Sequence, residues 1–208
     1  MHVALLGDSI LDNKVYTRGE PDVADHLRGV LPSSDLVTLC AIDGSATMDL
    51  KPQLERVPSG ASHIVLSLGG NDALMNLDML SLPVASTMEA LLVFRDRIRA
   101  FETSYRAALA ATLLLRRETA ICTIYNGDID PPQGEVTRVA LMMFNDVILR
   151  CGFERGLSII DLRLICNEKS DYANPIEPSG SGGLKIAKAI AGWLGRSRQK
   201  NPATVLTG

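Results

Sequence analysis

The strongest constraint on the fold is a set of five short apolar runs, each rich in Ile, Val or Leu. They cover residues 3–6, 36–39, 63–68, 120–125 and 157–161, and most are followed closely by Gly, Asp or Asn. Because the runs are almost continuously apolar, without polar alternation, they are typical of strands covered on both faces. The pattern therefore predicts a buried, parallel sheet.

Helical patterns lie between these runs, at residues 21–31, 48–55, 86–116, 136–155 and 182–196. The alternation of strands and helices predicts an α/β protein with three layers, α/β/α, around a five-stranded parallel sheet. No repeat, linker or shift in composition marks a second domain. We expect one domain over residues 1–200 and a loose tail over residues 201–208.

Composition narrows the function classes. With 46% hydrophobic residues, 22% charged residues and a formal charge of -3, the chain has no basic footprint for nucleic acid. Its apolar stretches are interrupted well before the roughly 20 residues that span a bilayer. The start of the sequence has no pattern of a secretory signal, which favours a cytoplasmic location. The four cysteines are widely spaced and lack zinc-ligand spacing, so we expect buried free thiols.

The loops after the strands are where a ligand site is expected. Strand ends of a parallel sheet meet at one edge, where loops converge and helix N-termini point inward. Ser9 follows the first run in the turn Gly7-Asp8-Ser9, and the next loops carry Asp43-Gly44-Ser45 and Gly69-Gly70-Asn71-Asp72. The loop over residues 126–134 is expected to line the pocket. From these loops we predict substrate contacts by Asp8, Asp72, Asn126 and Asn174.

These motifs resemble the conserved blocks of the GDSL or SGNH hydrolases. Gly7-Asp8-Ser9 is similar to the first block, residues 41–44 (Ala-Ile-Asp-Gly) to the second, and Gly69-Gly70-Asn71-Asp72 to the third. Each tripeptide or tetrapeptide is weak alone, but the three occur in the family's order and each follows a strand. The resemblance implies a flavodoxin-like sheet of order 2-1-3-4-5.

The resemblance also implies roles for these residues. Ser9 is the nucleophile that attacks an ester, and the N–H groups of Ser9 and Gly44 and the side-chain amide of Asn71 form the oxyanion hole. The substrate is a small-molecule acyl ester or an acetylated compound, and no cofactor or metal is required. The acyl group and leaving group are not specified, and the oligomeric state is not predicted.

The fourth block departs from the family pattern. The family places Asp-x-x-His before Pro and a helix-starting Gly, whereas this chain has Asn174 at the aspartate position and Glu177 at the histidine position. The three histidines, His2, His26 and His63, do not follow the carboxyl ends of strands. None of them is expected at the site.

Three interpretations follow. In the first, Glu177 is the general base for Ser9, burial raises its pKa, and Asn174 orients it by donating a hydrogen bond. In the second, the site binds acyl or glycosyl ligands without turning them over, because loss of the triad histidine is very costly in serine hydrolases. In the third, Glu177 caps the last helix or pairs with Lys185, and the acidic loops do other chemistry.

Overall fold

The computed structural model describes residues 1–198 and has a five-stranded parallel sheet of order β2-β1-β3-β4-β5. The fold class and the strand order predicted from the sequence are confirmed. The tail predicted for residues 201–208 lies outside the described residues, and the single domain stays a prediction. The strands are β1 (His2–Gly7), β2 (Leu36–Leu39), β3 (His63–Ser67), β4 (Glu118–Cys122) and β5 (Ser158–Ile160).

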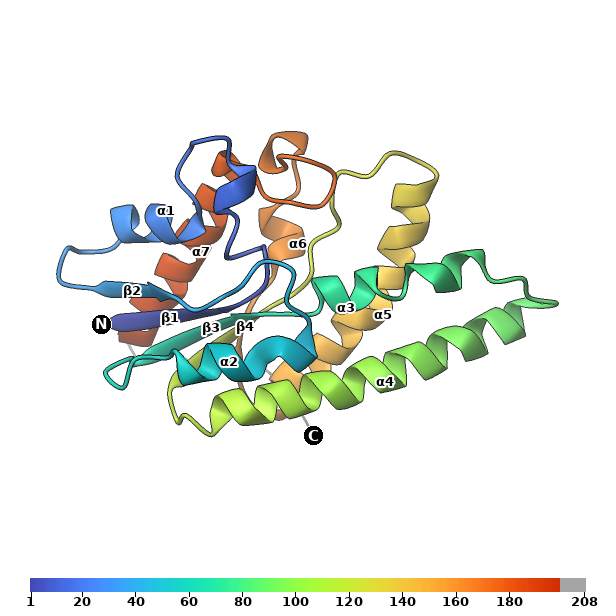
Figure 1. The fold of residues 1–208 in the computed structure, drawn as a ribbon, viewed down its shortest axis with the longest axis horizontal. Helices are drawn as coiled ribbons and strands as arrows, with labels where there is room; N and C mark the ends of the chain where they lie inside the picture. Colours follow the sequence, from blue (N-terminus) through green and yellow to red (C-terminus); the bar gives the residue numbers. More distant parts are fainter. Residues whose placement is uncertain (199–208) are drawn as a thin grey trace.

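Helices cover both faces of the sheet, as Figure 1 shows. One layer holds α1, α6 and α7, and the other holds α2, α4 and α5. The helices are α1 (Val23–Val30), α2 (Leu50–Glu55), α3 (Gly70–Leu74), α4 (Thr87–Leu113), α5 (Gln133–Glu154), α6 (Leu162–Ile165) and α7 (Gly180–Arg198). Within the described residues, short 3-10 helices lie between them: η1 (Lys14–Tyr16), η2 (Thr47–Asp49), η3 (Leu77–Ser81) and η4 (Lys169–Asp171).

The core has two halves because side chains alternate across each strand. In β1, Ala4 and Leu6 pack toward α4 and α5, where Tyr105 and Phe144 are buried. The intervening Val3 and Leu5 pack toward α1 and α7. Both faces of the strand are thus apolar, which explains why its sequence shows no polar alternation.

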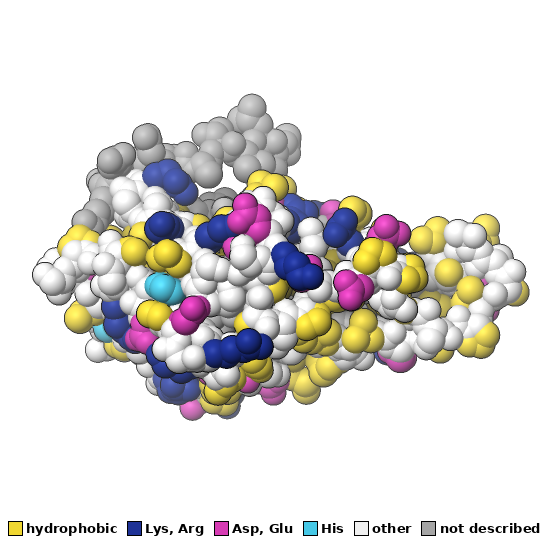
Figure 2. Space-filling model, turned by 90° about the horizontal axis from the view of Figure 1, so that it is seen from above, with side chains coloured by type: hydrophobic (Ala, Val, Ile, Leu, Met, Phe, Trp, Pro, Cys, Tyr) yellow, Lys and Arg dark blue, Asp and Glu magenta, His cyan; other side chains and the backbone are white. Residues whose placement is uncertain are grey.

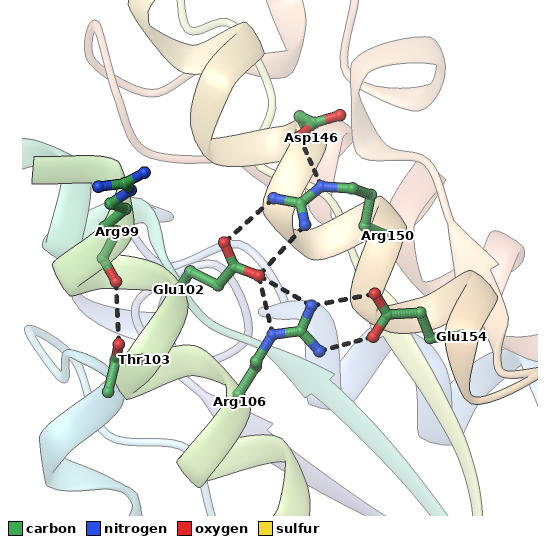
Figure 3. A network of polar contacts seen from close by, with 7 residues as sticks. All are labelled: Arg99, Glu102, Thr103, Arg106, Asp146, Arg150 and Glu154. Carbon is green, nitrogen blue, oxygen red and sulfur yellow. Dashed lines mark hydrogen bonds and ion pairs between the residues drawn. The ribbon is translucent and has the colours of Figure 1, made fainter. Parts of the chain in front are cut away.

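Ion pairs hold α4 against α5 outside the core (Figure 3). Glu102 of α4 accepts hydrogen bonds from Arg106 Nε at 2.8 Å and from both terminal nitrogens of Arg150 at 3.2 Å. Arg106 also reaches Glu154, and Arg150 reaches Asp146. Acidic and basic side chains alternate along this chain of contacts, which runs Asp146, Arg150, Glu102, Arg106, Glu154. The two helices are therefore joined by a network rather than by one pair.

Candidate active site

Ser9 stands in a tight turn directly after β1. Gly7 has a φ of +142°, and a Cβ at this position would lie 1.9 Å from the carbonyl oxygen of Ser67 on the neighbouring strand. Only glycine fits this close approach. The Asp8 side chain then accepts a hydrogen bond from the N–H of Ile10 at 3.1 Å, which fixes the turn around Ser9.

The structure brings Ser9 and Glu177 together from opposite ends of the chain. The Ser9 hydroxyl donates to Glu177 Oε1 at 3.1 Å, and the two residues are each only 7% exposed. Glu177 comes from the loop that precedes α7. A hydroxyl that donates to a buried carboxylate has a proton acceptor already in place.

Burial changes the acid–base properties of the two carboxyl groups beside the serine. It raises the pKa of Glu177 to about 7, with a contribution from the charge of Asp43, although the hydrogen bond from Ser9 opposes the rise. Burial raises the pKa of Asp8 to about 8, and the nearby Glu177 adds to that rise. Glu177 Oε2 and Asp8 Oδ2 are buried without a hydrogen-bond partner in the described part of the chain. At neutral pH, Glu177 is therefore poised near its titration midpoint while Asp8 is mainly protonated.

The loop that carries Glu177 is held from several sides. Asn174 Oδ1 accepts hydrogen bonds from the N–H groups of Ile176 and Glu177, both at 3.0 Å. The Tyr125 hydroxyl donates to the carbonyl of Ile176 at 2.6 Å, and Asn13 donates to the carbonyl of Pro178 at 3.2 Å. The expectation that Asn174 donates a hydrogen bond to orient Glu177 is wrong. Asn174 instead accepts from the backbone, because the tight turn points two N–H groups at its side-chain oxygen.

The second and third sequence blocks are tied to each other. Asn71 donates from Nδ2 to the carbonyl of Ser45 at 3.0 Å, and an amide nitrogen carries a second hydrogen. Asp72 accepts from the hydroxyl of Thr47 at 2.6 Å and from its N–H at 3.1 Å. Burial raises the pKa of Asp72 against these hydrogen bonds. Both oxygens of the Asp72 carboxyl group therefore accept hydrogen bonds from Thr47.

A glutamine that the sequence analysis missed joins the first block to the second. Gln53 is fully buried, and its amide exchanges hydrogen bonds with the N–H and the carbonyl of Gly7, each at 2.8 Å. The same amide nitrogen donates to the Ser45 hydroxyl at 3.1 Å. The sequence offers one signal for the role of Gln53, which is its polar side chain on the buried face of a short helix. That signal does not show which groups Gln53 would bond to.

An apolar pocket opens beside Ser9 and Glu177. Ser9, Asn71 and Asn126 line it, as do Asp8 and Glu177. Asp72 and Asn174 are not among the described residues that line it, and neither is Gly44. Most of the wall comes from residues outside the predicted loops: Leu74, Leu77, Met79 and Leu80 near α3 and η3, and Ala140, Leu141 and Phe144 of α5.

Gly44 lies at an exposed position in the loop after β2, with a φ of +78° that favours glycine. Its neighbour Ser45 accepts the Asn71 amide, and its neighbour Asp43 accepts a hydrogen bond from the Tyr16 hydroxyl at 2.8 Å. Asp43 also influences the pKa of Glu177 through its charge. The Gly44 loop therefore borders the Ser9 and Glu177 pair without forming part of the pocket wall.

The remaining candidates lie elsewhere. His2 contacts Thr38 on the neighbouring strand and His63 contacts Ser62, so both pair at the opposite edge of the sheet. Lys185 pairs with Glu168 and Asp171, so the suggested pair with Glu177 is not formed. All four cysteines are buried and free, as predicted.

Residues 1–198 hold no group of three or more His, Cys, Asp or Glu side chains arranged to bind a metal ion. No helix in this part of the chain combines the length and apolarity needed to cross a membrane.

Comparisons with known proteins identify the family of the chain. The chain is an esterase or acylhydrolase, because residues 5–182 match the GDSL-like Lipase/Acylhydrolase family. The chain belongs to that family. The expected resemblance is thus confirmed, and it extends well beyond the three blocks on which it was based. No curated protein matches the chain significantly in sequence.

Solved structures share the fold at low sequence identity. An acetyl xylan esterase, AlAXEase, has a TM-score of 0.72 at 16% identity, covering 93% of this chain and 100% of its own. A lipase from a goat rumen metagenome has a TM-score of 0.71 at 17% identity, covering 92% and 96%. An extracellular lipase from Streptomyces rimosus has a TM-score of 0.67 at 14% identity, covering 92% and 99%.

Proposed function

We propose that this protein hydrolyses carboxylic esters through a Ser9–Glu177 dyad, with Glu177 serving as the general base in place of a histidine. The observation that carries the proposal is the 3.1 Å hydrogen bond from the Ser9 hydroxyl to Glu177 Oε1, made between two buried side chains. A base works best when its pKa lies near the operating pH, and the pKa of Glu177 is raised to about 7.

The proposed reaction has two steps. Ser9 Oγ bonds to the ester carbonyl carbon as its proton moves to Glu177, and the tetrahedral intermediate collapses when the leaving alkoxide takes that proton. Water then attacks the acyl carbon as it gives a proton to Glu177, and the second tetrahedral intermediate collapses when its bond to Ser9 Oγ breaks. Ser9 Oγ takes the proton back from Glu177, and the carboxylic acid is released. In both steps, we assign the oxyanion to the N–H groups of Ser9 and Gly44 and to the second N–H of Asn71.

The pocket supports an acyl substrate. Its wall is largely apolar, with Leu77, Leu80 and Phe144 among the residues that line it. Such a wall favours the acyl part of an ester over a charged or strongly polar group. The similar structures include an acetyl xylan esterase and lipases, so short acyl esters and longer ones are both suitable first substrates.

A set of variants tests the proposal on short-chain aryl esters. Ser9→Ala should reduce the rate to the background, and Glu177→Gln should lower kcat/KM by about 10² to 10⁴, the usual contribution of a general base. Glu55→Gln is a matched control, because Glu55 is exposed at the end of α2. Each variant is checked for folding by its thermal unfolding.

Two results would count against the dyad. If Glu177→Gln is as active as the unmodified protein, the proton from Ser9 goes elsewhere. If the unmodified protein is no faster than Ser9→Ala, the site binds ligands without hydrolysing them, which is the alternative that the missing histidine raises.

A further inference from the structure

Gln53 is a buried amide of α2 that joins the segments to which we assign the oxyanion hole. Its Oε1 accepts from the N–H of Gly7 at 2.8 Å, and its Nε2 donates to the Gly7 carbonyl at 2.8 Å and to the Ser45 hydroxyl at 3.1 Å. Asn71 in turn donates from Nδ2 to the Ser45 carbonyl at 3.0 Å. A continuous line of contacts therefore runs from the end of β1, two residues before Ser9, to the amide of Asn71.

The turn that carries Gly44 is anchored to the end of β1 at two points. At its start, the N–H of Ile42 donates to the Gly7 carbonyl at 3.1 Å. The N–H of Ser45 closes the turn by donating to the Ile42 carbonyl at 3.2 Å. At the far end of the turn, the Ser45 hydroxyl accepts from Gln53, which is itself bonded to Gly7. Gln53 thus ties the far end of the turn to the same strand end as the near one.

A second buried amide shows what a purely structural role looks like. Asn145 of α5 exchanges hydrogen bonds with the N–H and the carbonyl of Ile124, each at 2.8 Å, just beyond the end of β4. Gln53 makes the same pair of bonds with Gly7 but gives its other N–H to Ser45 in a neighbouring loop. A side-chain amide has two donor hydrogens, so both of those on Gln53 are used. The bond to Ser45 has no part in closing the end of β1.

Gln53 can act only through groups inside the protein. Figure 2 shows charged side chains spread over the body of the molecule and apolar ones gathered toward one narrow end, whereas Gln53 has no exposed surface. It is also not among the described residues that line the pocket, so it does not meet a substrate there. An ionised glutamate in its place would have no hydrogen to donate, and burying its charge would be costly. A neutral amide is therefore suited to hold other groups in place.

We propose that Gln53 is a positioning residue that determines where the Asn71 amide lies relative to Ser9. Gln53 holds Ser45, and the carbonyl of Ser45 is the acceptor that orients Asn71. The inference rests on the proposed function, in which the second N–H of Asn71 binds the oxyanion. Such a donor works only within a narrow range of distances, and a misplacement of about 1 Å can lower the rate by about 100-fold.

Ser45→Ala tests the linkage with little disturbance to the fold. It removes the hydroxyl that Gln53 bonds but keeps the backbone carbonyl that accepts from Asn71. On a short-chain aryl ester, kcat should fall by about 10-fold and KM should change by less than about 2-fold, because a misplaced donor lowers transition-state stabilisation. Thr112→Val is the matched control. It also removes a buried hydroxyl, which donates to the Ala108 carbonyl within α4, and kcat should stay unchanged.

A double-mutant cycle shows whether the effect passes through Asn71. Asn71→Ala alone should lower kcat by about 10² to 10³, the usual cost of losing one oxyanion donor. Adding Ser45→Ala to Asn71→Ala should then cost less than about 2-fold, because the amide that is being positioned has been removed. A residue that only supports the fold would lower the thermal midpoint, and its effect on kcat would be the same with and without Asn71.

Crystal structures of Gln53→Met and Ser45→Ala measure the placement without catalysis. In each, the Asn71 amide nitrogen should move relative to Ser9 Oγ by more than about 0.5 Å, the tolerance of a working site. Ser45→Ala carries the test if Gln53→Met does not fold.

Three results would each overturn the inference: full kcat in Ser45→Ala, an equal loss of kcat with and without Asn71, or an Asn71 amide that keeps its place in these structures. If the unmodified protein hydrolyses no ester, the proposed function fails by itself. The position of the Asn71 amide in the two variants then decides the inference about Gln53.

Discussion

Glu177 occupies the position in the fourth sequence block where the family pattern has a histidine, and a carboxylate and an imidazole differ in what makes them basic. An imidazole has an unperturbed pKa of about 6.5, whereas an exposed glutamate is too acidic to take a proton from a hydroxyl efficiently. Burial disfavours the charged form and, with the charge of Asp43, brings the pKa of Glu177 to about 7 against the opposing hydrogen bond from Ser9. A buried glutamate thus acquires a proton affinity close to that of a histidine.

The pH dependence of hydrolysis should report this residue. Only ionised Glu177 accepts the Ser9 proton, so kcat/KM should rise with pH through an apparent pKa of about 7 and then level off. Rates on a soluble aryl ester between about pH 5 and pH 9 measure it, and residual activity in Glu177→Gln should lose the rise. A rise centred near 4, the ordinary value for a glutamate, would contradict the assignment.

Asp8 should influence stability more than hydrolysis. Its pKa is raised by burial from an ordinary 3.8 to about 8, so the folded state holds a proton that the unfolded state releases. Stability should therefore be greatest below about pH 4 for this group and should fall as pH rises toward 8.

Asp8→Asn should remove the fall in stability at higher pH, because asparagine does not ionise. Its free energy of unfolding should match that of the unmodified protein at about pH 4 and exceed it at about pH 8, by on the order of 1 kcal/mol or more. Urea unfolding at the two pH values measures the difference. Equal stabilities at both would show that Asp8 ionises at low cost.

At the scale of elements, the loop from Asn174 to Pro178 determines where the base lies. Two N–H groups of this loop bond to the Asn174 side chain, and Tyr125 and Asn13 hold its carbonyls. These contacts come from within the loop and from two distant parts of the chain. A decayed site has no chemical reason to keep the loop so firmly placed, and this favours a working base.

Asn174 is a positioning residue in this interpretation. Asn174→Ala removes the acceptor for the Glu177 N–H and should lower kcat by about 10-fold with a small change in KM, because misplacing a base costs transition-state stabilisation. Asn174→Asp keeps the acceptor oxygen and should retain most of the activity. If both variants lose activity equally, the side chain acts in another way. If both remain fully active, the loop does not need this cap.

Much of the fold could be predicted because each element carries its own pattern. The apolar strands and the long amphipathic helix are local features, and the structure confirms them within a few residues. The apolar run at residues 120–125 predicted a strand that continues to residue 125, whereas β4 ends at Cys122. Ile124 exchanges its N–H and carbonyl hydrogen bonds with the Asn145 side chain rather than with a strand.

The site could be predicted less completely. The sequence motifs identify Ser9, Asn71 and Glu177 because each stands in a recognisable block after a strand or before a helix. Gln53 and the Thr47–Asp72 pair could not be found, because their partners are set by tertiary contacts. The short elements α3 and η3, which supply much of the pocket wall, are too brief to show helical periodicity.

At the scale of the whole molecule, the ion-pair network in Figure 3 links α4 to α5, and α5 supplies part of the pocket wall. Glu102 accepts from two arginines, which lower the pKa of its carboxyl. A carboxylate with a lowered pKa stabilises the fold above its ordinary pKa, and this contribution is lost as pH falls through the lowered value. The network thus couples the long α4 to the body of the protein by charge as well as by packing.

Glu102→Gln should therefore destabilise the protein, because Arg106 and Arg150 lose the carboxylate they share. We expect a loss of about 1 kcal/mol at low salt, since the group is partly exposed, and a smaller loss in about 1 M salt, where charges are screened over about 3 Å. Urea unfolding at neutral pH and at both salt concentrations measures this loss.

Asp96→Asn is the control, because Asp96 pairs on the surface only with its neighbour Arg95 among the described residues. It should change stability by less than about 0.5 kcal/mol. A loss in Glu102→Gln that is the same in low and high salt would show that the network acts through packing, with charge making little contribution.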